Sequence, residues 1–134
     1  MSSCSGSVRT TARKLARILI VDDLVDAADS LARVLCRLGY EVRAVYDGAS
    51  AVTAADEFLP DAILLDLALP QFDGFQVAAQ LRQRSKLQSV CLIAVSGFGQ
   101  AGDLEQTRAA GFNFHLIKPV NLDDLQRLLS KLPS

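Results

Sequence analysis

The sequence predicts an α/β protein built on one doubly wound, five-stranded parallel sheet, and two patterns support this prediction. Continuous apolar runs at 18–21, 62–65 and 90–95 are typical of strands buried on both faces of a sheet. Between such runs lie stretches with apolar residues at the i, i+3, i+4, i+7 spacing of an amphipathic helix. Alternating strands and helices favour right-handed crossovers, a three-layer sandwich and the strand order 2-1-3-4-5.

The other elements follow in chain order. Residues 42–46 alternate weakly between apolar and polar side chains, as in a strand near an edge, and 114–117 form a short fifth strand. Helical stripes, of which the fourth has the thinnest apolar face, occupy 28–38, 51–59, 75–81, 101–110 and 122–132. Gly39 is expected to end the first helix, while Asp47 and Asn121 are expected to cap the second and fifth.

Length, charge and composition limit the function classes. The 134 residues suit one domain, here 17–134, preceded by a Ser-, Thr- and Arg-rich lead-in over 1–16 that we expect to be disordered. A net charge of −1 without a concentrated basic face argues against nucleic acid as a partner. No apolar run reaches the roughly 18 residues of a membrane span, so we expect no membrane partner.

The three cysteines are Cys4, Cys36 and Cys91, and their spacing fits no metal or disulfide framework. Cys36 and Cys91 lie in apolar stretches, so we expect small core thiols in a reducing, cytoplasmic setting.

Polar side chains stand where four of the predicted strands end. These residues are Asp22, Asp23, Asp66, Ser96 and Lys118. Ligands of such sheets bind outside the carboxyl ends of the strands, so the five side chains are expected to converge. Two charges about 4 Å apart repel by roughly 4 kcal/mol at an effective dielectric of about 20. Lys118 can offset one of these charges and a divalent cation two more, and carboxylate oxygens are ligands that suit Mg²⁺.

Each of these residues also has an ordinary structural interpretation. Asp22 and Asp23 suit a helix cap pair, Asp66 an ordinary loop acid, and Lys118 a solvated side chain. The coincidence of the right side chains at four strand ends favours the functional interpretation.

Four segments in this order resemble the receiver domain of bacterial two-component response regulators, a CheY-like family with a flavodoxin-like fold. They are ILIVDD, PDAILLDLALPQFDGF, AVSG and GFNFHLIKPV. The resemblance runs from about Arg17 to Leu132, nearly the whole chain, and it makes 17–134 a receiver domain.

The resemblance implies a role for each site residue. Asp66 would be the phosphoacceptor, and Asp22, Asp23, Asp66 and the backbone carbonyl of Ala68 would hold Mg²⁺, with Mn²⁺ as the alternative ion. No other cofactor is expected.

A second group of residues would bind the phosphoryl group or respond to it. Ser96, where threonine is commoner, and Lys118 would bind it, and Pro119 would form a cis peptide bond that aims Lys118. His115 stands where the family usually has a tyrosine or phenylalanine switch. The alternative is that His115 is a plain surface side chain.

The implied function is a phosphorylation-dependent switch and not a turnover enzyme. A histidine kinase or histidine phosphotransfer protein would donate the phosphoryl group, and a downstream protein would receive the signal by contact. The family's usual output surface, its fourth helix, fifth strand and fifth helix, is also a candidate for a homodimer. We expect either a stand-alone regulator or a receiver from a hybrid kinase.

Three rival functions remain. Gly97, Gly99 and Gly102 match the dinucleotide fingerprint, but they follow the fourth predicted strand instead of the first. A Mg²⁺-dependent aspartyl-phosphate phosphatase resembling the haloacid dehalogenases would need a second Asp where Ala68 stands. A third rival is an interaction module that has the fold but is not phosphorylated.

Overall fold

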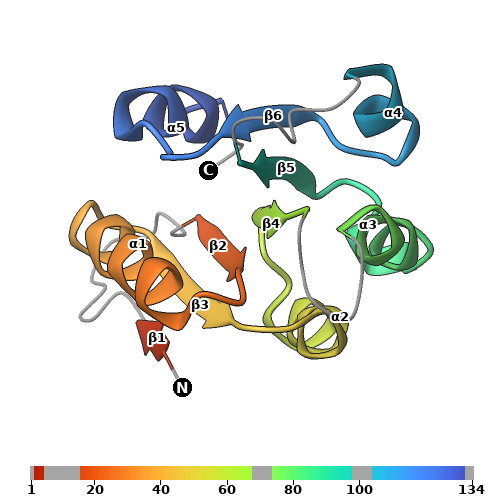
Figure 1. Ribbon diagram of the computed structural model, residues 1–134. Coiled ribbons are helices and arrows are strands. Elements are labelled where there is room, and N and C mark those ends of the chain that lie inside the picture. Colours follow the sequence, from red (N-terminus) through yellow and green to blue (C-terminus); the bar gives the residue numbers. More distant parts are fainter. Residues whose placement is uncertain (1, 5–15, 68–73, 98–103, 132–134) are drawn as a thin grey trace.

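The computed structural model describes residues 2–4, 16–67, 74–97 and 104–131. Its sheet has the strand order β1-β3-β2-β4-β5-β6 (Figure 1). The last five of these strands run parallel to one another. Numbered along the chain from β2, they follow the expected order 2-1-3-4-5, which confirms the predicted doubly wound fold. No helix among the described residues is long and apolar enough to cross a bilayer.

The elements lie close to the predicted ranges. The strands are β1 (Ser2–Cys4), β2 (Arg17–Val21), β3 (Glu41–Val45), β4 (Ala62–Asp66), β5 (Cys91–Ser96) and β6 (Phe114–Ile117). The helices are α1 (Val25–Arg37), α2 (Gly48–Phe58), α3 (Gly74–Arg82), the 3₁₀ turn η1 (Ser85–Leu87), α4 (Leu104–Ala109) and α5 (Leu122–Leu129). Helix α4 is shorter than the 101–110 stretch predicted for it, of which 101–103 lie outside the described residues.

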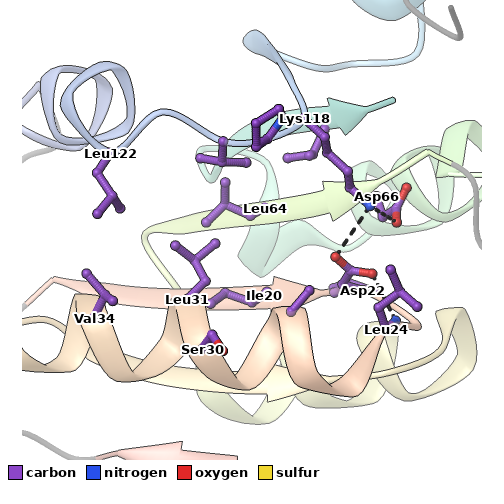
Figure 2. A pocket seen from close by; sticks show the side chains of 15 residues that line it. Ile20, Asp22, Leu24, Ser30, Leu31, Val34, Leu64, Asp66, Lys118 and Leu122 are labelled. Carbon is purple, nitrogen blue, oxygen red and sulfur yellow. Dashed lines mark hydrogen bonds and ion pairs between the residues drawn. The ribbon is translucent and has the colours of Figure 1, made fainter. Parts of the chain in front are cut away.

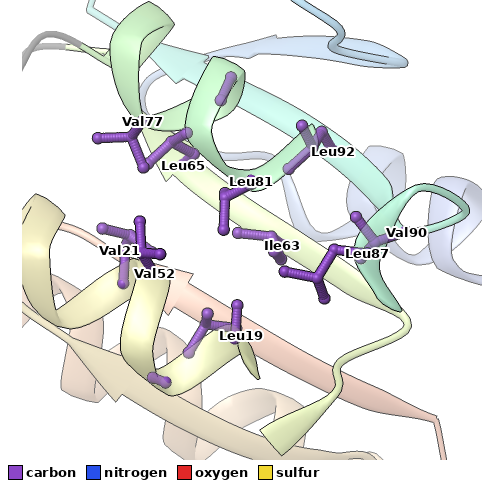
Figure 3. Packing of buried hydrophobic residues seen from close by; sticks show 14 of the residues in the cluster. Leu19, Val21, Val52, Ile63, Leu65, Val77, Leu81, Leu87, Val90 and Leu92 are labelled. Atoms are coloured by element: carbon purple, nitrogen blue, oxygen red, sulfur yellow. The ribbon is translucent and has the colours of Figure 1, made fainter. Parts of the chain in front are cut away.

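Helices cover both faces of the sheet, with α1 and α5 on one face and α2 and α3 on the other (Figure 1). Successive side chains of a strand point to opposite faces. In β2, Leu19 and Val21 therefore join the cluster under α2 and α3 (Figure 3), while Ile18 and Ile20 join the cluster under α1 and α5. Continuous apolar runs are explained by this double burial.

The predicted caps of α2 and α5 are present. The Asp47 side chain accepts a hydrogen bond from the Ser50 N–H at 2.7 Å, and the Asn121 side chain accepts one from the Asp124 N–H at 3.1 Å. Each bond satisfies an N–H group that has no partner within its helix. By contrast, α1 begins after Leu24 without a side-chain cap.

The N-terminal segment differs in part from the expected disordered lead-in. Ser2–Cys4 form β1, which pairs antiparallel with β3 at the edge of the sheet. An exposed strand edge offers unpaired N–H and C=O groups, and this explains why a short polar segment can add to β3. The division into a lead-in over 1–16 and a domain over 17–134 otherwise stays a prediction.

The expectation for Cys36 was wrong. Cys36 is disulfide-bonded and only half-buried, whereas Cys91 is a half-buried free thiol. The helix that carries Cys36 has contacts with β1, and Cys36 is not among the residues packed in or against the two core clusters. The sequence pattern could not show this contact because it predicted no strand at β1.

The Arg82 guanidinium connects the end of α3 with the two turns that precede β5 and β6. Its Nη1 donates to the carbonyls of Leu87, Gln88 and Val90 at 2.9–3.2 Å. Its Nε and Nη2 both donate to the carbonyl of Gly111, and Nη2 also reaches Asn113 Oδ1 at 2.9 Å. Arg82 thereby fixes the end of α3 to the turns before β5 and β6.

Replacing this guanidinium should destabilise the fold. We expect Arg82→Ala to lower the free energy of unfolding by about 2–3 kcal/mol, because hydrogen bonds to a charged donor are lost at several carbonyls together. The matched control is Arg84→Ala, which removes an exposed ion pair with Asp56 and should cost less than about 1 kcal/mol. Urea denaturation measures both, and equal losses would contradict the role given to Arg82.

Candidate functional site

The parallel strands bring the predicted polar side chains to one edge of the sheet. Asp22 follows β2, Asp66 ends β4, Ser96 ends β5 and Lys118 follows β6. The register pairs Val21 with Leu65 and Asp66 with Val95, so neighbouring strands end at the same level. The carboxyl ends of β2, β4, β5 and β6 therefore form one site.

Three carboxylates gather at this site. Asp22, Asp23 and Asp66 each offer an oxygen, and these oxygens all lie within 4.8 Å of one another. Asp66 is only 3% exposed, and the Asp22 side chain is 13% exposed. Burial makes the repulsion between these groups stronger than it would be in water.

Lys118 supplies the positive charge that faces this cluster. Its Nζ lies 2.8 Å from Asp66 Oδ2 and 3.5 Å from Asp22 Oδ2 (Figure 2). The Lys118–Pro119 peptide bond is cis. The backbone N–H of Lys118 donates to the carbonyl of Ser96 at 2.8 Å, which fixes the start of the Lys118 loop to the end of β5.

The charges of the cluster change two pKa values. Burial raises the pKa of Asp22, and the nearby Asp66 charge adds to this effect, against the opposing Leu24 N–H and Lys118 ammonium. Burial also disfavours the charged form of Lys118, but its hydrogen bond to Asp66 and the charges of Asp66 and Asp22 outweigh this and raise the pKa of Lys118. The ammonium therefore stays charged while the carboxylates remain under mutual repulsion.

Ser96 and His115 form a second contact beside the cluster. Ser96 is fully buried, and its Oγ lies 2.7 Å from His115 Nε2. His115 is half-buried on β6, the edge strand of the sheet, whose Ile117 is 46% exposed. The contact links the strand next to Asp66 with the outer edge of the sheet.

The donor set suits a hard divalent cation. Carboxylate oxygens are the ligands that Mg²⁺ prefers, and one lysine cannot balance three carboxylates. Burial raises the pKa of Asp22, and the neighbouring Asp66 charge adds to this, so a bound cation would favour the charged form of Asp22. Ala68, whose carbonyl was predicted as a further ligand, lies outside the described residues.

Gly74 allows α3 to begin against the segment that follows Asp66. A Cβ at this position would lie 2.6 Å from Leu67 Cα and 2.9 Å from the Asp66 carbonyl oxygen. The Gly74 N–H donates to the Leu67 carbonyl at 3.1 Å. This close approach explains the glycine in the QFDGF segment.

An apolar cavity of about 570 Å³ opens beside the site, between α1 and the segment from Lys118 to Leu122 (Figure 2). Asp22, Asp66 and Lys118 line one end, and the rest of the lining is mainly apolar. Leu24, 59% exposed, and Leu122, 38% exposed, also line it. The sequence pattern did not predict this cavity. The one feature that could have pointed to it is the apolar Leu24, which directly follows the acidic Asp22–Asp23 pair.

Comparison with known sequences identifies relatives of this chain. The family described as the response regulator receiver domain matches residues 18–130. The transcriptional regulatory protein PrrA of Mycobacterium tuberculosis is 38% identical over 109 residues, which are 81% of this chain and 46% of PrrA. The DNA-binding regulator RpaA of Synechocystis is 33% identical over 81% of this chain and 45% of RpaA. The chain thus spans less than half the length of these two relatives.

Solved structures agree with this comparison. A CheY-like receiver domain from Methylobacillus flagellatus is 31% identical with a TM-score of 0.81, covering 90% of this chain and 100% of that one. The receiver domain of the sensor histidine kinase PA1611 from Pseudomonas aeruginosa is 34% identical with a TM-score of 0.79, covering 89% of this chain and 98% of that one. That structure has a magnesium ion coordinated in its active-site cleft. The chain belongs to the response regulator receiver domains of two-component signalling systems.

Proposed function

We propose that this domain is a signalling switch that accepts a phosphoryl group on Asp66. The observation that supports the proposal most strongly is the 2.8 Å contact between Lys118 Nζ and the buried Asp66, inside a cluster of three carboxylates. A nucleophilic carboxylate beside a fixed cation meets the main requirement of phosphoryl transfer, which is positioning and charge neutralisation.

The transfer step can be written from the residues of this chain. A carboxylate oxygen of Asp66 attacks the phosphorus of a phosphohistidine, a P–O bond forms, and the P–N bond breaks with its electrons returning to the donor imidazole. The Lys118 ammonium then bonds a phosphoryl oxygen, as does the Ser96 hydroxyl. A partner histidine kinase or histidine phosphotransfer protein supplies the donor.

Mg²⁺, with Mn²⁺ as the alternative ion, would be held by Asp22, Asp23 and Asp66, and by the Ala68 carbonyl. When bound, it would neutralise charge on the phosphoryl oxygens. Asp22 is oriented for this role because its Oδ1 accepts the Leu24 N–H at 3.0 Å. Lys118 offsets one of the remaining negative charges.

The output would travel by protein contact. The new phosphoryl group adds negative charge that draws Ser96 toward it, and His115, in contact with Ser96, carries the change to β6. A downstream protein, or a second copy of the domain, would bind the surface of α4, β6 and α5.

We expect a cytoplasmic location. The disulfide at Cys36 is exceptional for this location because the cytoplasm keeps thiols reduced.

The donor protein has to cover the rim of the site to reach Asp66. Leu24 and Val25 are 59% and 46% exposed directly beside Asp22, and exposed apolar side chains of this size are suited to protein contact. Leu24 and Val25 form the rim of the site in this sense. A protein donor would contact this rim, whereas a small phosphodonor can reach Asp66 without contacting it.

Acetyl phosphate with Mg²⁺ should add one phosphoryl group to the domain, at Asp66. Intact-protein and peptide mass spectrometry would measure the adduct, and Asp66→Asn should remove it because an amide is not a nucleophile for this step. Asp56→Asn, a change in an exposed ion pair, serves as the control and should leave the adduct in place. Absence of any adduct would favour the interaction module that is not phosphorylated, and steady hydrolysis of a phosphomonoester would favour the phosphatase.

Without metal, Asp66→Asn should also raise the free energy of unfolding, by on the order of 1 kcal/mol. The substitution removes a charge that repels Asp22, while Lys118 keeps Asp22 as a partner at 3.5 Å. Mg²⁺ should then stabilise the wild type more than the variant, because binding to the native state adds to its stability. Thermal melts with EDTA and with Mg²⁺ measure both effects, and a metal-free variant that melts below the wild type would contradict the repulsion.

Leu24→Gln should slow phosphotransfer from a phosphorylated histidine phosphotransfer protein about tenfold, the effect of losing roughly 1.4 kcal/mol of contact energy. Phosphorylation by acetyl phosphate should change little. Leu38→Gln is the matched control, since Leu38 is 46% exposed at the far end of α1. Equal slowing by both variants, or equal slowing with both donors, would exclude a role for this rim.

A further inference from the structure

The contact between Ser96 and His115 joins two groups that can each donate or accept a hydrogen. Ser96 Oγ lies 2.7 Å from His115 Nε2, and Ser96 is fully buried. A hydroxyl has one hydrogen to donate, and a neutral imidazole carries its single hydrogen on either Nδ1 or Nε2. The distance alone therefore permits two directions for this bond.

In the resting protein, burial selects one direction. The contact with His115 is the one side-chain hydrogen bond that the described residues give Ser96. If Nε2 donated, the buried hydroxyl hydrogen would have no acceptor among the residues that the structure describes, and an unpaired buried hydroxyl costs about 1–3 kcal/mol. This cost favours a resting arrangement in which Ser96 donates to His115 Nε2 and the ring hydrogen lies on Nδ1, the nitrogen outside this bond.

Phosphorylation of Asp66, which is the proposed function on which this inference rests, would remove this arrangement. The Ser96 hydroxyl has one hydrogen, and a phosphoryl oxygen on Asp66 would take it as a charged acceptor. Ser96 Oγ would then face Nε2 with lone pairs on both atoms. This repulsion disappears when Nε2 carries a hydrogen and donates it to Ser96 Oγ.

We propose that phosphorylation of Asp66 reverses the direction of the Ser96–His115 hydrogen bond. His115 Nε2 gains a hydrogen from water, and at a pH where the ring stays neutral Nδ1 returns one to water, so the exchange balances. His115 is half-buried, which leaves the ring a route to solvent. His115 is thus a positioning residue that satisfies the Ser96 hydroxyl in both states.

The chain has a single histidine, so its ring nitrogens can be observed without assignment by mutation. Nitrogen NMR of the full chain with Mg²⁺, at about pH 8 where an ordinary imidazole is neutral, reports which nitrogen carries the hydrogen. At rest we expect Nδ1 to be pyrrole-type and Nε2 pyridine-type. Fluoroberyllate, a phosphoryl mimic, should move Nε2 to the pyrrole-type region.

Two variants test whether Ser96 transmits the change. Ser96→Thr keeps the hydroxyl and should keep the reversal, whereas Ser96→Ala should lose it at saturating fluoroberyllate. Fluorine NMR follows binding of the mimic independently of the ring. A change that persists in Ser96→Ala would overturn the inference.

The wild-type spectra separate the remaining outcomes. Hydrogen on Nε2 already at rest, or on Nδ1 alone after the mimic has bound, would overturn the reversal and leave the phosphoacceptor role intact. If fluoroberyllate did not bind at all, the proposed function would fail and the reversal with it.

Discussion

The ion pair between Lys118 and the buried Asp66 is the interaction on which the site depends. Three carboxylates stand at the strand ends, and Lys118 is 2.8 Å from one of them and 3.5 Å from another. A single ammonium leaves the cluster with excess negative charge, while burial, with a smaller contribution from the Asp66 charge, raises the pKa of Asp22. The same excess suits the cluster to attract a divalent cation and, with it, the phosphoryl group of a donor.

The hydrophobic core makes this unfavourable cluster tolerable. Strands β2, β4 and β5 are buried on both faces, and their apolar side chains divide between the two clusters that flank the sheet. Gly74 lets the start of α3 pack closely against Leu67, and the Arg82 side chain fixes the end of α3 to the Gly111 carbonyl. The strand ends can therefore keep charges together at a cost that the rest of the domain offsets.

The contact of Ser96 with His115 connects this chemistry to an exposed edge. Ser96 is fully buried beside the strand of Asp66, whereas β6 carries the half-buried His115 and the exposed Ile117. A change in the direction of this one hydrogen bond would therefore alter His115 on β6, an edge strand that a partner protein can contact. The cost of leaving a buried hydroxyl unpaired would make this coupling directional.

Periodicity determined most of the fold, and the order of the strand ends predicted which side chains gather at one edge of the sheet. The runs at 18–21 and 62–65 favour buried strands of a parallel sheet, and such a sheet places Asp22 and Asp66 at one edge because strands that run in one direction end together. The tertiary structure decided what depends on contacts between distant segments. The addition of β1, the disulfide of Cys36, the Arg82 bonds, the cavity beside Leu24 and the pairing of Ser96 with His115 are of this kind. The local sequence pattern cannot predict these features. The spacing of side chains along a strand indicates the face on which each lies but not the atom that it contacts there.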